Sequence, residues 1–167
     1  MNVESRSGEP KFHRFVAPLS PQTFELLQFT APIAGYNTTD TYNRAIQCFA
    51  FWKGESVIGH AIDEPVGLFY GDSEDKEEPK PIELRQIVDL SERVASVSVK
   101  ITDKTAKDLS FLGGLMNTPP EEQVDPAIQF YAQLMEHSFN GDKILLKKGD
   151  RFERLIMRPE DKPDKNK

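Results

Sequence analysis

The chain has 167 residues and a formal net charge of −6. Its length fits one domain, which buries about 70% of the surface that the unfolded chain exposes. The negative charge argues against nucleic acid as a partner, because neutralising phosphates needs a basic face. No stretch approaches the roughly 20 apolar residues of a membrane helix, so we expect no membrane partner and a cytoplasmic location.

The content of cysteine and histidine argues against metal chemistry. One cysteine makes no internal disulfide, and one cysteine with three scattered histidines makes no structural zinc site without carboxylate ligands. We therefore expect neither a metal nor a cofactor. Residues 1–11 and 158–167 are polar and charged, which predicts disordered tails around a single domain at 12–157.

The first predicted element is a short helix that begins after Ser20, with Pro21 at its first position and Pro32 as its stop. Residues 35–43, GYNTTDTYN, are typical of a loop. The apolar run at 45–52 and the turn-like KGE that follows it favour a β-hairpin. A further short strand is expected at 65–70.

An acidic loop is expected at 71–81, because like charges repel and oppose compact packing. It lacks the residue order of a calcium-binding loop. We take its carboxylates as the candidate partner-binding residues: Asp72, Glu74, Asp75, Glu77 and Glu78.

The second half of the chain has the clearest periodicity. Alternating apolar residues at 82–90 and 95–101 predict two strands of an antiparallel hairpin. Two helices follow, one capped by Asp103 and one capped by Asp125 and ended by Asn140-Gly141. Residues 143–148 and 151–157 predict a closing hairpin, although 151–157 also fit a short helix, and no internal repeat of useful length is expected.

The sole cysteine, Cys48, and His60 are the candidate catalytic pair, for a thiol-dependent hydrolase or transferase. In a hairpin with a three-residue loop at 52–54, the two side chains would share one face. We expect Cys48 instead to be a buried apolar side chain, because its neighbours are Phe49, Ala50 and Phe51 and an apolar strand raises the pKa of a thiol.

His60 in a GHA context, with the later segment VSVKITDKTAKDLSFL, is loosely similar to the circularly permuted papain-like hydrolases. In that family the nucleophilic cysteine follows the histidine, whereas no cysteine follows His60 here. The resemblance therefore implies a copy that is inactive by that mechanism.

Taken together, these patterns predict an α+β domain with a largely antiparallel sheet of seven to eight short strands and about three helices packed on it. Because no catalytic constellation is evident, we expect a non-catalytic protein-binding protein, such as an adaptor, an inhibitor or an accessory protein. Its partner would contact the acidic loop or an exposed sheet edge. A small-ligand binding module is a third hypothesis.

Overall fold

The computed structural model describes residues 12–71, 78–84, 95–155 and 157. The described part contains four α-helices and six strands in two small antiparallel sheets. The mixed α+β class is confirmed, but the prediction of one sheet with seven to eight strands is wrong. Both predicted tails and most of the acidic loop lie outside the described residues.

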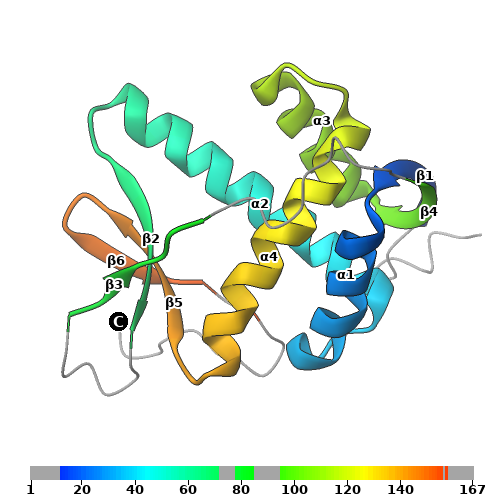
Figure 1. The fold of residues 1–167 in the computed structure, drawn as a ribbon. Helices are drawn as coiled ribbons and strands as arrows, with labels where there is room; N and C mark the ends of the chain where they lie inside the picture. Colours follow the sequence, from blue (N-terminus) through cyan, green and yellow to red (C-terminus); the bar gives the residue numbers. More distant parts are fainter. Residues whose placement is uncertain (1–11, 72–77, 85–94, 156, 158–167) are drawn as a thin grey trace, which may run out of the picture.

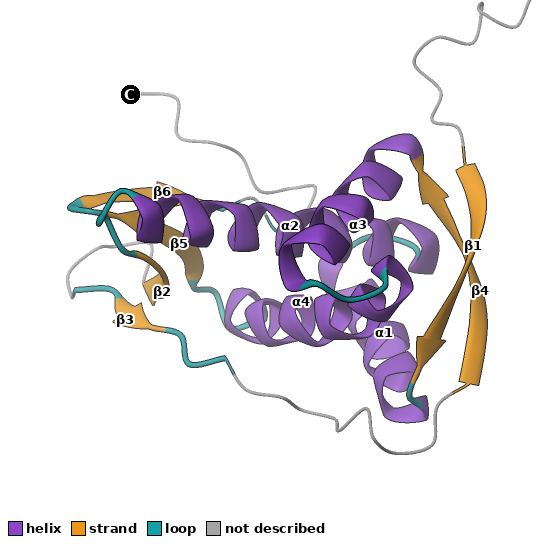
Figure 2. Cartoon of the chain, turned by 90° about the horizontal axis from the view of Figure 1, so that it is seen from above, coloured by secondary structure: helices purple, strands orange, loops and turns teal. Residues whose placement is uncertain are grey.

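The two sheets lie at opposite ends of a helical layer (Figures 1 and 2). One is a two-stranded ribbon of β1 (Phe12–Leu19) and β4 (Ala95–Thr102). The other has the order β3-β2-β5-β6 and comprises β2 (Val66–Gly71), β3 (Lys80–Pro81), β5 (Lys143–Lys148) and β6 (Arg151–Arg154). Between them lie α1 (Pro21–Ala34), α2 (Thr38–Ala61), α3 (Asp103–Met116), the 3-10 helix η2 (Pro120–Gln123) and α4 (Val124–Phe139).

The helical part and the ribbon are built from two copies of one unit. Each unit is a strand followed by two helices, β1-α1-α2 and then β4-α3-α4, and equivalent residues are 82 positions apart, as Ser20 is from Thr102. Ser20 caps α1 and Thr102 caps α3, each accepting from the backbone N–H three residues on. The prediction that the chain holds no internal repeat is therefore wrong.

The ends of the first helices repeat as well. Gly35 ends α1 with φ 82° and Asn117 ends α3 with φ 57°, and these left-handed positions are also 82 residues apart. Glycine and asparagine are the residues that adopt this conformation at least cost.

The buried positions of the two units coincide. In the first helices Thr23 and Leu27 are buried, as are Thr105 and Leu109. In the second helices the tripeptide Ala-Ile-Gln occurs twice, at 45–47 and 127–129, and its alanine and isoleucine are buried in both copies. The two units thus contribute equivalent side chains to one continuous apolar core.

The ribbon relates the two units by a pseudo-two-fold axis. Val16 of β1 lies opposite Ser98 of β4 in the antiparallel register, and these two residues are themselves equivalent in the repeat. An approximate dyad therefore passes through this pair. The arrangement matches a symmetric dimer whose two protomers are joined in one chain.

Buried polar side chains fasten each second helix to the other unit. The Ser20 N–H donates to Oδ2 of Asp125 over 3.0 Å, and the Thr102 N–H donates to Oδ1 of Asn43 over the same distance. Asp125 also accepts from Thr23 Oγ1 at 3.1 Å and from Gln129 Nε2 at 2.6 Å. The buried Asp125 is thus matched with hydrogen-bond donors from both units, as a buried carboxylate requires.

The hairpin predicted after residue 45 is wrong, because residues 38–61 form the single helix α2. Its glycines serve close packing instead of a turn. A Cβ at Gly54 would lie 3.3 Å from the Phe111 ring, and one at Gly59 would lie 2.5 Å from the Glu64 carbonyl oxygen. The helix packs against α1, α3, α4, β2 and β4, so apolar residues on several sides obscure its period.

Several predicted helix boundaries also need correction. Helix α1 continues past Pro32 to Ala34, since a proline in the last turn removes a single helical hydrogen bond. The expected loop at 35–43 ends at Asn37, which caps α2. Asp103 follows the cap Thr102, and Asp125 is the second residue of α4.

The predicted hairpin of 82–90 with 95–101 lies partly outside the described residues, which exclude 85–94. The predicted strand at 95–101 is confirmed as β4, and it pairs with β1, which the sequence did not predict. Residues 82–84 are not in a strand, so this part of the prediction is wrong. The strand at 65–70, the end of α4 at residue 139 and the closing β5–β6 hairpin are confirmed, with residues 151–154 as a strand.

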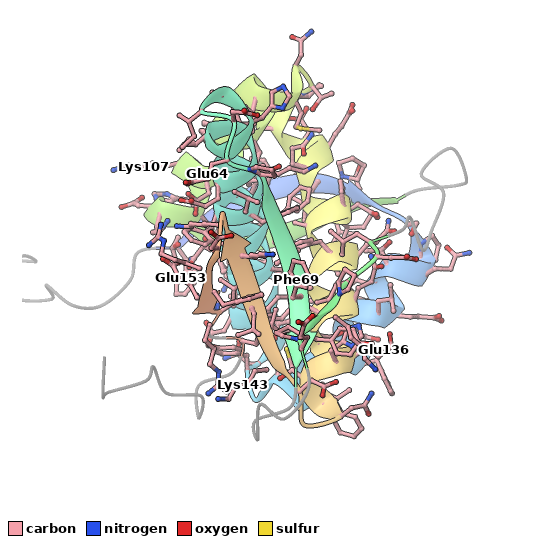
Figure 3. The ribbon with its side chains drawn as sticks, turned by 90° about the vertical axis from the view of Figure 1, so that its left-hand side faces the viewer. Glu64, Phe69, Lys107, Glu136, Lys143 and Glu153 are labelled. Atoms are coloured by element: carbon pink, nitrogen blue, oxygen red, sulfur yellow. The ribbon has the colours of Figure 1, made fainter. Side chains whose placement is uncertain are left out.

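The four-stranded sheet covers the ends of α2 and α4. Leu68, Ile144 and Leu146 are buried on its inner face, and Tyr70 stacks on His137 of α4 at 4.1 Å between ring centroids. Figure 3 looks onto this sheet, with Phe69 labelled on β2. None of the described helices is long and apolar enough to span a membrane.

Replacing Asp125 tests the packing between the units. Asp125→Ala removes the acceptor of three donors, and we expect it to lower the free energy of unfolding by about 3–5 kcal/mol, because a buried donor left unsatisfied costs about 1–3 kcal/mol. Asp125→Asn should cost much less, because asparagine occupies the equivalent position 43. Urea unfolding of both variants measures the two free energies of unfolding. Equal losses of stability would contradict the structural equivalence of positions 43 and 125.

Candidate functional site

The outer face of the β1–β4 ribbon is an exposed surface that carries two cations, Arg14 and Lys100. Side chains alternate along a strand, and odd-numbered residues such as Ala17 and Leu19, with Val99 and Ile101 opposite, are buried against the helices. Even-numbered residues face outward, and Val16 at the centre is 55% exposed. In Figure 2 this ribbon forms one edge of the molecule.

Two cations face each other on this surface. Arg14 lies directly opposite Lys100 in the register, and both are exposed. Directly opposed residues in an antiparallel pair have Cβ atoms about 4.5–5.5 Å apart, and like charges in such a pair destabilise the ladder. The other outward positions are uncharged: Phe12, Val16, Pro18, Ser96, Ser98 and Thr102.

Carboxylates occupy other parts of this end of the molecule. Asp103, at the start of α3, pairs with His13 at the end of the ribbon. Asp40 lies in the first turn of α2, and Glu121 and Glu122 lie in η2 before α4. Among the described outward positions of the ribbon, Arg14 and Lys100 are therefore the charged residues, and both are cations.

The structure does not bring Cys48 and His60 together. Both belong to α2, and twelve residues of helix separate them by about 18 Å along the axis. His60 is exposed near the end of the helix. The strand context on which the resemblance to papain-like hydrolases depended is also wrong, because residue 60 is helical.

Cys48 is half-buried and lines a pocket of about 310 Å³ between α2, the start of α3 and β6. Among the described residues that line it are Arg44, Lys104 and Arg154, and none is a histidine. Burial raises the pKa of the Cys48 thiol, and the nearby charge of Arg44 opposes this shift with a smaller effect. A thiol in this setting is a poor nucleophile at neutral pH.

The predicted partner-binding carboxylates cannot be placed as a group. Asp72, Glu74, Asp75 and Glu77 lie outside the described residues, and Glu78 is exposed just before β3. Their role stays a prediction. Among the residues that the structure describes, no group of three or more histidine, cysteine or acidic side chains could hold a metal ion.

A second open feature is an apolar groove of about 730 Å³ between the C-terminal halves of α1 and α4. Phe29 of α1 and Phe139 of α4 line it and are 71% and 64% exposed. Exposed apolar side chains that line one groove make this groove a candidate contact surface. Glu136 and Gln133 provide polar groups at the groove.

Comparison with known proteins gives no identification: neither a family model, nor a curated protein, nor a solved structure matches this chain significantly. The assignment of function must therefore come from the site itself.

Local sequence signals do not predict a strand at 12–19, so they do not predict the ribbon. The internal repeat was the available signal. Thr23, Leu27 and Phe29 recur as Thr105, Leu109 and Phe111, and the Ala-Ile-Gln tripeptide recurs at the same spacing of 82 residues. Aligning the two copies would have placed a strand before Ser20.

Thiol labelling tests the placement of Cys48. Because the folded structure raises the pKa of this thiol, less thiolate is present at pH 8 than in the unfolded chain. We expect labelling of the native protein to be at least about tenfold slower than in denaturant, with an apparent pKa above the ordinary 8.5 or so. Fast labelling with a lower pKa would support the catalytic alternative.

Proposed function

We propose that this chain binds double-stranded DNA by laying the β1–β4 ribbon into the major groove. The observation that supports this most is the exposed pair of Arg14 and Lys100, placed opposite each other on the outer face. Opposed like charges cost stability in a ladder. A local loss of stability is expected where side chains are used for binding. Acceptor groups of a bound ligand would offset the repulsion between the two cations.

The dimensions of the ribbon fit this groove. Eight paired residues in each strand give a length of about 27 Å, and the strands lie about 5 Å apart. The major groove of B-form DNA is about 12 Å wide and 8.5 Å deep and admits a two-stranded ribbon. The major groove of A-form RNA is too narrow for side chains to read, so the duplex would be DNA.

The outward side chains have the chemistry of base recognition. Arginine and lysine donate to O6 and N7 of guanine, and a serine hydroxyl donates or accepts. Arg14, Lys100 and Ser98 supply these groups, and the exposed methyl groups of Val16 suit the methyl group of thymine. All four project from the same face of one ribbon.

This proposal departs from the expectation based on net charge. The net charge of −6 weakens the attraction of the whole chain to any duplex. The net charge is, however, a sum over the whole chain and does not describe the local charge of the ribbon. The two cations lie on a face without described carboxylates, so they can approach the groove. Because the general electrostatic attraction is small, we expect selective binding to depend on contacts in the groove.

Selection from a library of random DNA duplexes tests the proposal. At about 50 mM salt, where phosphate contacts are strong, the full chain should retain duplexes and enrich a defined motif. Arg14→Gln with Lys100→Gln should weaken binding to the enriched duplex by at least about tenfold, because each good contact to a base contributes about 1–3 kcal/mol.

The matched control is Lys80→Gln with Arg151→Gln, which removes the same charge from exposed positions in the four-stranded sheet. It should bind the enriched duplex almost as well as the unchanged chain. Absence of retained DNA, or equal losses in the two double variants, would contradict the proposal.

Protein binding is the second candidate, favoured by the exposed Phe29 and Phe139 in the groove between α1 and α4. A groove between two helices accepts the apolar face of a third helix. This keeps the sequence-based prediction of a protein partner, but moves the contact to another surface. The acidic loop stays an alternative contact surface.

Affinity purification from the source tests this second candidate. A partner that uses the groove should be lost with Phe29→Asp and kept with Phe152→Ser, which alters an exposed phenylalanine of the distant β6. Deleting residues 72–79 tests the acidic loop in the same assay. A partner that tolerates the Phe29 change would exclude the groove as its docking site.

A further inference from the structure

The symmetry of the ribbon determines the symmetry of the DNA sequence that it would recognise. The pseudo-dyad passes through Val16 and Ser98, so the ribbon has two halves, one on each side of this pair. A dimer of identical chains presents the same side chains on both sides of its dyad. Such a dimer binds sites whose two halves are related by the same two-fold symmetry.

In this chain the two halves of the outer face differ. Arg14 is equivalent to Ser96 in the repeat, and Lys100 is equivalent to Pro18. Because Arg14 pairs with Lys100 and Pro18 pairs with Ser96, both cations lie on one side of the dyad. Among the described outward positions, the other side carries a proline without a side-chain donor and one serine hydroxyl.

The two halves therefore have different chemistry toward bases. Arg14 and Lys100 only donate, and the paired acceptors O6 and N7 on the major-groove edge are found only on guanine. Ser96 contacts any base that offers a donor or an acceptor, and Pro18 is half-buried and adds apolar contact. Strong preference for one base is thus expected only in the half of the site that contacts Arg14 and Lys100.

Resting on the proposed function, we infer that one copy of this chain recognises one asymmetric DNA site, with a guanine-containing half against Arg14 and Lys100. Both strands of the ribbon come from the same chain, so a single copy supplies the complete reading surface. A second copy is not needed to fill the groove. The centre of the site lies against Val16 and Ser98.

Selection from random DNA duplexes, followed by native mass spectrometry of the complex, tests this inference. We expect a motif without two-fold symmetry, with guanine fixed in one half only, and one chain per duplex. Arg14→Ser with Lys100→Ser should remove the guanine preference and lower affinity for the selected duplex by about tenfold or more. All substituted positions are exposed, and circular dichroism melting checks that each variant folds.

The decisive variant moves one cation across the dyad. Arg14→Ser with Ser96→Arg leaves the charge of the chain unchanged and should give a motif with guanine in both halves, one read by Lys100 and one by the transplanted arginine. A motif from the unchanged chain that is palindromic, or two chains per duplex, would overturn the inference while DNA binding stands. Retention of no duplex would overturn both.

Discussion

The antiparallel pairing of β1 with β4 is the interaction on which the rest of the structure depends. Residues 20–94 separate the two strands, yet their register places equivalent residues, Val16 and Ser98, opposite each other. That register fixes the approximate two-fold relation of the two strand-helix-helix units. The loop-closure entropy for such a distant pairing grows only slowly with length, so the core that it completes can offset it.

Each unit leaves the ribbon through a capped helix, and each second helix returns to the opposite unit. Asn43 bonds to the backbone of Lys100 and Thr102, and Asp125 bonds to Ser20 and Thr23. Equivalent positions thus perform the same task with different chemistry. The buried networks fix how the ribbon sits on the helices, and the proposed DNA contact would need this fixed placement of the outward side chains.

The same frame accounts for the differences between the two units. Helix α2 has 24 residues and α4 has 16. Residues 38–41 of α2 correspond to the separate helix η2 of the second unit, and residues 58–61 extend α2 to the start of β2, where Gly59 lies against Val66. Cys48 in α2 takes the place that Phe130 has in α4, and the smaller side chain lines the pocket beside β6. The outward residues of β1 and β4 also differ between the two units, because these residues do not contribute to the core.

Local sequence signals predicted several elements well. Ser20-Pro21 marks the start of α1, the apolar spacing after Asp125 marks α4, and Gly149 marks the turn of the last hairpin. Each of these signals is contained within a few residues. They also predicted the alternation of Ser96, Ser98 and Lys100 on one exposed face of β4, which is half of the candidate site.

The elements that were predicted wrongly depend on contacts with residues that are distant in the sequence. Helix α2 contacts neighbours on several sides, so its apolar residues do not form one stripe, and its glycines resemble turn residues. The partner of β4 could not be found without β1, whose alternation is hidden by Phe12 and Val16 on the exposed face. Arg14 therefore escaped notice, and the opposed cations emerged only from the register.

Nuclear Overhauser effects between the backbone protons of β1 and β4 test the central claim most directly. In the labelled full chain, we expect contacts between Val16 and Ser98 and between Arg14 and Lys100, as the antiparallel register requires. Contacts from Ser98 to residues 82–90, with none to β1, would contradict the ribbon, the pseudo-two-fold axis and the binding surface together.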